Sequence, residues 1–276
     1  MSAPMRSEVF ADGVLDGRVT LVTGGGTGLG RAAARELAAC GATVVIAGRR
    51  EEPLAEAADA IGAAYVVGDV REDADAERIV RTCLDRHGRL DVLVNNAGGQ
   101  YFVPAEAIEP KGWRAVTRLN LGGTERMSRI AADLAMRPAG GGTIVNVTLS
   151  PHHGFPGMAH SSTARAAVEG YTRALAREWA ADGIAVLAIA PGHFDTAVLA
   201  KYPENVRRGA AATVPLGRMG REPEHAWLVA LAASAALGKA FSGSVITIDG
   251  ARDNWFGSWP PSSLLDDTGT VPTEER

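Results

Sequence analysis

The sequence predicts an α/β fold: a single doubly wound domain built around a seven-stranded parallel sheet. Short apolar runs rich in β-branched residues alternate with amphipathic helical stretches along the 276 residues. Most of these runs are continuously apolar, as expected of parallel strands that are buried on both faces. A glycine-rich turn separates the first run from the first helical stretch, which is the strand–turn–helix unit of such sheets.

The expected strands, in chain order, are 19–22, 43–47, 64–67, 90–94, 143–147, 184–189 and 244–248. The main amphipathic stretches between them are 31–39, 74–86, 164–180 and 222–234. We find no internal repeat and no linker that would divide the chain. The prediction is therefore an N-terminal arm (1–13), one catalytic and dinucleotide-binding domain (14–253) and a C-terminal extension (254–276).

Composition narrows the class of protein. With 46% hydrophobic and 22% charged residues, the chain resembles ordinary soluble globular proteins. A net charge of −4 gives no basic field for nucleic acid or anionic membranes. No apolar run reaches the ~18 residues of a membrane span, and the N-terminus lacks a secretory signal. Cys40 and Cys83 lie in helical patterns, so we expect buried apolar residues rather than a disulfide or metal site, and a cytoplasmic protein.

The last residues differ from the rest. Residues 251–276 are rich in Pro, Ser, Asp and Trp and show neither helical nor strand periodicity. Two interpretations stay open. The segment is a loose tail, or it is a flap that lays Trp255 and Trp259 over a neighbouring subunit or over the active site.

The glycine-rich turn has the form of a phosphate-binding loop. Residues 23–30 read Thr-Gly-Gly-Gly-Thr-Gly-Leu-Gly, with Gly24, Gly28 and Gly30 in a G-x-x-x-G-x-G spacing. Glycines let the backbone approach a pyrophosphate, and the following helix offers free N–H groups and a favourable dipole. By itself the motif does not exclude an ordinary glycine-rich turn.

The end of the second strand predicts which dinucleotide binds. An acid at this point accepts hydrogen bonds from the ribose of NAD, but here Arg49 and Arg50 follow Gly48. A guanidinium suits the dianionic 2′-phosphate of NADP(H), and a solvated charged turn is the alternative. After the third strand, Asp69 and Val70 are placed to meet adenine, or Asp69 belongs to a helix N-cap region.

Further motifs follow in order: Asn95-Asn96-Ala97-Gly98, Asn120, and Pro191-Gly192 followed by Thr196. With the glycine spacing and Asp69, they resemble the short-chain dehydrogenase/reductase family, from about Gly17 to Asp253. The resemblance implies a Rossmann domain, a nicotinamide cofactor and a homotetramer or homodimer. The cofactor-binding positions that it implies are Gly24, Thr27, Gly28, Leu29, Gly30, Arg49, Asp69, Val70, Asn96, Ala97, Gly98, Arg165, Pro191, Gly192 and Thr196.

The sequence departs from the family at its proton-handling residues. The family's Tyr-x-x-x-Lys pair is replaced by Ser161 and Arg165, and Leu149 stands where a serine is common. Arginine fixes positive charge but does not donate a proton at working pH, and serine is a poor acid. The sequence therefore disfavours a simple alcohol dehydrogenase.

A branch of the family shares this departure. The chain resembles peroxisomal trans-2-enoyl-CoA reductase and, more loosely, the 2,4-dienoyl-CoA reductases. The shared features are residues 98–100 (Gly-Gly-Gln), 104–106 (Pro-Ala-Glu), 111–113 (Lys-Gly-Trp), 154–156 (Gly-Phe-Pro) and His-Ser-x-x-Ala-Arg at 160–165. This resemblance implies NADPH-dependent reduction of a carbon–carbon double bond conjugated to a carbonyl, often a thioester.

That chemistry assigns roles to the remaining polar residues. Hydride addition to the β-carbon leaves an enolate, whose oxygen Ser161, Thr148 and Arg165 could stabilise without acting as acids. Asn120 matches the asparagine that bends its helix in this family and holds a water for proton relay. A polar kink residue without a chemical role is the alternative.

The proton donor is left open by the sequence. His152 and His153 lie in the loop after the fifth strand and titrate near neutrality, unless they are simply solvated. Glu169 is an acid if buried, or forms an i,i+4 ion pair with Arg165. Tyr101 is a further candidate, with a core or lid role as the alternative.

The stretch 194–212 follows the Pro-Gly motif and is expected to form the substrate lid. Its apolar and basic side chains are Val198, Leu199, Lys201, Tyr202, Arg207 and Arg208. The basic ones would meet the phosphates of an acyl-CoA or carrier-bound substrate, or face solvent.

The residues favour an NADPH-dependent enoyl-type reductase acting on a small-molecule substrate, with no metal, nucleic-acid or membrane partner. Two other classes stay open. One is a biosynthetic family member that acts on a carbonyl, imine or cyclic intermediate with another acid. The other is a non-redox NADP(H)-binding scaffold or cyclase, because function resides in the site rather than in the fold.

Overall fold

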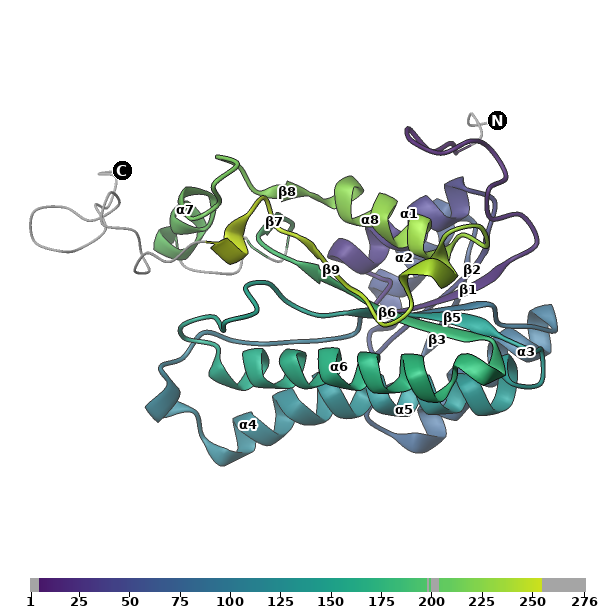
Figure 1. Cartoon of the computed structure of the whole chain (residues 1–276), viewed down its shortest axis with the longest axis horizontal. Helices are drawn as coiled ribbons and strands as arrows, with labels where there is room; N and C mark the ends of the chain where they lie inside the picture. Colours follow the sequence, from purple (N-terminus) through teal and green to yellow (C-terminus); the bar gives the residue numbers. More distant parts are fainter. Residues whose placement is uncertain (1–4, 198, 200–203, 255–276) are drawn as a thin grey trace, which may run out of the picture.

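The computed structural model describes residues 5–197, 199 and 204–254, and it has a parallel sheet covered by helices on both faces (Figure 1). The sheet has seven strands in the order β3-β2-β1-β4-β5-β6-β9, and every neighbouring pair is parallel. Its strands are β1 (Val19–Thr23), β2 (Thr43–Gly48), β3 (Ala64–Val67), β4 (Val92–Asn95), β5 (Gly142–Val147), β6 (Ile184–Pro191) and β9 (Val245–Ile248). The predicted fold class is confirmed.

Helices form one layer on each side of the sheet (Figure 1). The helices are α1 (Gly28–Ala39), α2 (Glu51–Ile61), α3 (Asp73–His87), α4 (Pro110–Thr117), α5 (Gly123–Ala131), α6 (Ala159–Glu178), α7 (Glu204–Ala212) and α8 (Glu222–Ala233). Residues of α1, α2 and α8 share one hydrophobic core with the sheet, and residues of α3, α5 and α6 share the other. Strands β7 (Phe194–Asp195) and β8 (Gly220–Arg221) pair separately.

Burial on both faces explains the continuous apolar strands. In β4, Leu93 packs into one core, whereas Val92 and Val94 pack into the other. Successive side chains of a strand point to opposite faces, so a strand covered on both sides needs an apolar residue at every position.

Several predicted boundaries shift by a few residues. The fourth strand begins at Val92 rather than at residue 90, although Leu90 is buried. Helix α6 begins at Ala159, earlier than the predicted 164, so Ser161 lies in its first turn. The N-terminal arm is tied to the domain, because Ser7 Oγ donates to the Glu36 carboxylate and Phe10 packs against the core.

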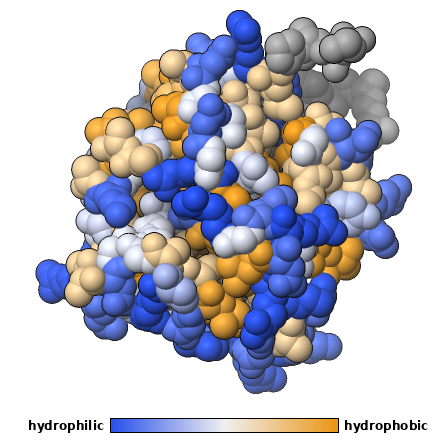
Figure 2. Space-filling model, turned by 90° about the vertical axis from the view of Figure 1, so that its right-hand side faces the viewer, coloured by the Kyte–Doolittle hydropathy of each residue, from blue (hydrophilic) through white to orange (hydrophobic). Residues whose placement is uncertain are grey.

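Cys40 and Cys83 are free thiols with no exposed surface, as expected for small apolar residues. Burial raises the pKa of Cys40 to about 11 and that of Cys83 to about 12. Hydrophilic and hydrophobic residues are intermingled on the face of the molecule shown in Figure 2. Over the described residues, no helix has the length and apolar character that crossing a bilayer requires.

Candidate functional site

Two adjoining pockets lie at the carboxyl ends of the central strands. We call them the Arg49 pocket and the Arg165 pocket; they share Gly24, Thr27, Ala97 and Gly98. The predicted cofactor positions in the Arg49 pocket, besides the shared ones, are Arg49, Asp69 and Val70. Those in the Arg165 pocket are Gly28, Leu29, Gly30, Asn96, Arg165, Pro191, Gly192 and Thr196. The structure thus places every predicted cofactor position on a pocket wall, and their binding roles stay predictions.

The glycine turn leaves no room for side chains. Gly24 has a φ of +69°, and a Cβ there would lie 2.8 Å from Asn96 Nδ2. Asn96 Nδ2 also donates to the Thr23 carbonyl at 2.9 Å, and Thr23 Oγ1 accepts from the backbone N–H of Ala97 at 3.0 Å. These bonds tie the turn after β1 to the end of β4. The resulting cradle of backbone at the start of α1 fits a bound pyrophosphate.

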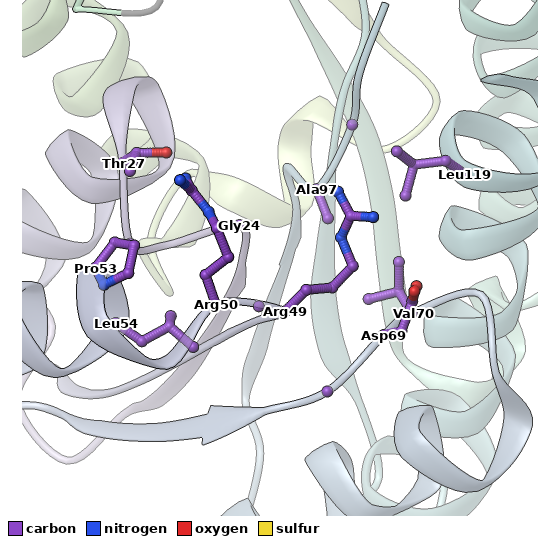
Figure 3. Close-up of a pocket in the computed structure, with 14 residues that line it drawn as sticks. Gly24, Thr27, Arg49, Arg50, Pro53, Leu54, Asp69, Val70, Ala97 and Leu119 are labelled. Carbon is purple, nitrogen blue, oxygen red and sulfur yellow. The ribbon is translucent and has the colours of Figure 1, made fainter. Parts of the chain in front are cut away.

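The Arg49 pocket carries two exposed guanidinium groups (Figure 3). The guanidinium of Arg50 lies toward Thr27, and that of Arg49 lies toward Ala97. Glu51 is exposed and accepts a hydrogen bond from the Tyr65 hydroxyl at 3.3 Å, which leaves the solvated charged turn open as the alternative. Both guanidinium groups line the pocket, where they can meet an anion.

Asp69 also lines the Arg49 pocket, but its carboxylate is already paired. Arg71 Nε donates to Asp69 Oδ1 at 2.9 Å, and this hydrogen bond lowers the pKa of Asp69. The N-cap residue of α3 is Glu72, and Asp69 belongs to the turn before it, where its Oδ1 accepts from the Arg71 backbone N–H at 3.0 Å. A ligand that uses the Asp69 carboxylate has to share it with Arg71.

Arg165 places a fixed cation at the other end of the site. Arg165 lines the Arg165 pocket and is 6% exposed. Its Nη1 donates a hydrogen bond to the Val147 carbonyl at 2.6 Å. The guanidinium rests on Gly98, where any side chain would overlap it. Burial lowers the pKa of Arg165 to about 10, so the group stays positively charged at neutral pH.

Ser161 is placed less favourably than the sequence suggests. It is fully buried, its Oγ has no hydrogen-bond partner among the described residues, and it is not one of those that line the Arg165 pocket. Thr148 and Leu149 do line this pocket. Of the predicted oxyanion-stabilising residues, Arg165 and Thr148 therefore both line the Arg165 pocket, whereas Ser161 does not.

Asn120 lies in a π-helical turn, Arg118–Gly122, between α4 and α5. Its Oδ1 accepts from the Gly99 N–H at 2.9 Å, and its Nδ2 donates to the Gly99 carbonyl at 3.0 Å. Asn120 thus holds the loop after β4 in place. It does not line the Arg165 pocket within the described residues, and its role in holding a water stays a prediction.

His152 and Glu169 lie together behind Thr148. His152 Nδ1 is 2.8 Å from Glu169 Oε1, and Thr148 Oγ1 donates to the same oxygen at 3.2 Å. The predicted i,i+4 ion pair between Glu169 and Arg165 is therefore not formed. Glu169 instead pairs with His152 and, at 3.8 Å, with Arg173. Among the described residues, His152 is not part of the pocket wall.

Residues 18–207 match a family model described as short chain dehydrogenase. The chain belongs to this family. It is 35% identical over 260 residues (87% of this chain, 86% of the relative) to the peroxisomal 2,4-dienoyl-CoA reductase, (3E)-enoyl-CoA-producing, of Arabidopsis thaliana. It is 38% identical over 256 residues (88% and 97%) to the cis-4-hydroxycyclohexanecarboxylate dehydrogenase of Sinomonas cyclohexanicum. Among solved structures, the citronellol catabolism dehydrogenase (AtuB) of Pseudomonas aeruginosa PAO1 superimposes with a TM-score of 0.80 at 38% identity, covering 89% of this chain and 98% of that one.

As a short chain dehydrogenase, the protein is an oxidoreductase that uses a nicotinamide cofactor. Two further candidate proton donors, Tyr101 and His153, line neither pocket in the described part of the chain. Tyr101 packs edge-on against His160, with ring centroids 4.5 Å apart. His153 Nδ1 lies 3.3 Å from Asp253 Oδ1. Tyr101 is 39% exposed, so it is not a core residue, and a lid role stays a prediction.

His193 and the aromatic wall of the Arg165 pocket were not predicted from the sequence. His193 follows Pro191-Gly192 and lines this pocket; burial lowers its pKa to about 4, so it is neutral at neutral pH. Phe155 packs edge-on against Phe102 (5.6 Å between centroids) and His193 (5.4 Å). The signal for His193 was its position directly after the end of a central strand, where this fold places ligand-binding residues.

The predicted lid is described only in part. Thr196 and Leu199 line the Arg165 pocket, and Arg207 pairs with Glu204 on α7. The other positions named for the lid and the flap lie outside the described residues or their described side chains: Val198, Lys201, Tyr202, Arg208, Trp255 and Trp259.

Proposed function

We propose that this oxidoreductase is an NADPH-dependent reductase of a carbon–carbon double bond conjugated to a carbonyl. The observation that carries the proposal is the chemistry of the Arg165 pocket. Among the described residues that line it, the ionisable ones are Arg165 and His193. The described part of this wall offers a fixed cation and the hydroxyl-bearing Thr148, but neither a phenol nor a carboxylate.

Interconversion of an alcohol and a ketone needs a group that exchanges a proton with the substrate oxygen. Arg165 does not serve, because it stays protonated. His193, with a pKa of about 4, is neutral near pH 7 and is both a poor proton donor and a weak base. Reduction of an enone or enoyl thioester separates hydride addition from protonation. The α-carbon takes up its proton after the enolate has formed, so the proton source need not be an acid on the pocket wall. Charge collects on the carbonyl oxygen, and a preorganised guanidinium stabilises that charge without giving up a proton.

The cofactor assignment rests on the Arg49 pocket. The cradle around Gly24 would hold the pyrophosphate, Arg165 the nicotinamide ribose, and Arg49 with Arg50 the 2′-phosphate. When bound, NADPH supplies the hydride that reduces the β-carbon. The end of β2 supports NADP(H) over NAD, because Gly48, Arg49 and Arg50 stand where an acid would accept hydrogen bonds from the ribose of NAD.

The substrate side of the Arg165 pocket is apolar and aromatic, with Phe102, Phe155 and Met158 on its wall. An apolar acyl chain or ring fits this lining. The relative that reduces a dienoyl-CoA supports a thioester, and an acyl-CoA or carrier-bound substrate is part of the proposal. We also propose that the protein is a homodimer or homotetramer and that it is located in the cytoplasm.

The test follows the label from deuterated NADPH. The protein is incubated with labelled NADPH and a series of enoyl-CoA thioesters and free enones, and the products are analysed by mass spectrometry and NMR. We expect one deuterium on the β-carbon and a solvent-derived hydrogen on the α-carbon. Deuterium on a carbonyl carbon would instead support carbonyl chemistry, as the names of the two dehydrogenase relatives suggest. NADPH binding without turnover of any substrate would contradict both.

A further inference from the structure

A continuous chain of polar side chains leads from the wall of the Arg165 pocket to the protein surface. It consists of Thr148 at the wall, Glu169 in the interior and His152 at the outer end. We propose that these residues form a proton relay, which delivers the proton that the α-carbon takes up after hydride addition. This inference rests on the proposed function, and it assigns a proton source that the described residues of the pocket wall do not provide.

The geometry connects the three residues through one atom. Thr148 Oγ1 donates to Glu169 Oε1 at 3.2 Å, and His152 Nδ1 lies 2.8 Å from the same oxygen. Thr148 is 3% exposed, whereas the His152 side chain is 29% exposed. A single carboxylate oxygen thus joins a buried hydroxyl on the pocket wall to an imidazole that reaches water.

His152 is held in the orientation that this path needs. Its backbone N–H donates to Asp253 Oδ1 at 2.6 Å, and its Nε2 lies 2.9 Å from Thr247 Oγ1. A carboxylate beside Nδ1 requires a proton on that nitrogen. The ring can therefore present the Nδ1 proton to Glu169 while Thr247 satisfies the other nitrogen.

The proton transfers balance as follows. The His152 imidazolium gives its Nδ1 proton to Glu169 Oε1, and the Thr148 hydroxyl turns from this oxygen toward the substrate. The Thr148 hydroxyl proton then moves to the α-carbon of the enolate, the Thr148 oxygen takes the proton from Glu169 Oε1, and Glu169 returns to the carboxylate. The neutral imidazole, with its remaining proton on Nε2 beside Thr247, then recovers a proton from water. No oxidant or reductant enters these steps.

Two charged groups on the neighbouring elements face the relay. Arg173, one turn along α6, lies 3.8 Å from Glu169 Oε2. Asp253, in the segment after β9, accepts the His152 backbone N–H through its Oδ1. The relay as proposed starts with its proton on His152, beside the Glu169 carboxylate.

The test compares relay variants with a matched control on α6. Glu169→Gln replaces the carboxylate, which can take up and release a proton, with an amide of the same size, which cannot. His152→Gln removes the imidazole ring. Glu178→Gln is the control, because Glu178 lies in the last turn of the same helix and is exposed. We expect kcat for enone reduction to fall about 100-fold in both relay variants, as for loss of a general acid, and to stay within twofold in the control.

Three readouts distinguish a relay from a merely structural role. The wild type is expected to lose activity at high pH and to show a solvent deuterium isotope effect on kcat. Both are expected to change in Glu169→Gln, while NADPH binding is unaffected. Thr148→Val should reduce kcat as strongly as Glu169→Gln, Thr148→Ser should restore most of that loss, and the Thr148→Val/Glu169→Gln double variant should be no slower than either.

The outcomes separate the relay from the proposed function. If the wild type reduces enones but Glu169→Gln and His152→Gln keep its kcat and its pH profile, the relay is wrong and the enone reductase stands. If the wild type reduces no enone, the proposed function fails first and the relay with it. Should Glu169→Gln fail to fold, His152→Gln at the exposed end of the chain decides the question.

Discussion

Replacement of Arg165 by methionine tests the central assumption about the active site. The guanidinium is 6% exposed and keeps its charge, because a pKa of about 10 leaves roughly one molecule in a thousand neutral at pH 7. Methionine has a similar length and fills the space beside Gly98 without a charge.

The size of the effect follows from Coulomb's law. A unit charge about 4 Å from a developing oxyanion, in a partly buried site with an effective dielectric constant of about 20, contributes roughly 4 kcal/mol. Loss of a preorganised donor in comparable sites slows the reaction by about 10² to 10³, or roughly 3 to 4 kcal/mol. We therefore expect kcat of Arg165→Met to fall by at least about 100-fold.

Stability should change much less than activity. The variant loses the hydrogen bond from Nη1 to the Val147 carbonyl, which costs about 1–3 kcal/mol, but it also removes a charge whose desolvation is unfavourable. The assay is stopped-flow NADPH oxidation together with urea unfolding, and Arg177→Met, an exposed position on the same helix, is the control. A kcat within threefold of the wild type in folded Arg165→Met would refute the oxyanion role.

Three other substitutions test separate parts of the molecule. Arg49→Ser should weaken NADPH binding by about 10- to 100-fold and leave NADH binding unchanged in fluorescence titrations, because a charged hydrogen bond contributes about 1.5–3 kcal/mol. Glu224→Gln should lower the free energy of unfolding by about 1–2 kcal/mol at pH 7, because an Arg218 hydrogen bond lowers the pKa of Glu224 to about 2. The stabilisation by the Glu224 carboxylate is present above pH 4.5 and is lost on acidification toward pH 2. His225→Leu should stabilise the protein, because both ring nitrogens are buried without a partner among the described residues and burial lowers the pKa of His225 to about 4. The unfolded state binds that proton first as pH falls below about 6.5, so the gain in urea unfolding should be about 2 kcal/mol larger at pH 5 than at pH 7.5; equal gains at both pH values would contradict this reasoning.

Local patterns predict the sheet and the cofactor cradle well, because the information lies in neighbouring residues. Val92, Leu93 and Val94 have to be apolar since each packs into one of the two cores. Gly24 has to be glycine because its positive φ and the nearby Asn96 amide exclude a side chain. A short stretch of sequence contains most of what determines such positions.

The contacts of Arg165 and Glu169 were harder to predict, because the residues that meet there come from distant segments of the chain. Spacing on α6 suggested that Glu169 meets Arg165, but the structure directs it to His152, in a loop that is held by Asp253 about a hundred residues later. Ser161 aligns with the family's tyrosine, yet a hydroxyl on a short side chain remains buried where a phenol would extend outward. Periodicity carries no information about either arrangement.

The way in which the two pockets adjoin has a consequence for engineering. They share a short seam of Gly24, Thr27, Ala97 and Gly98, while Arg49 and Phe155 belong to one pocket each. Changes on either side of the seam should act independently, since separated sites combine additively. Coenzyme preference and substrate range could then be redesigned in parallel and merged in one polypeptide, provided that the seam itself is left intact.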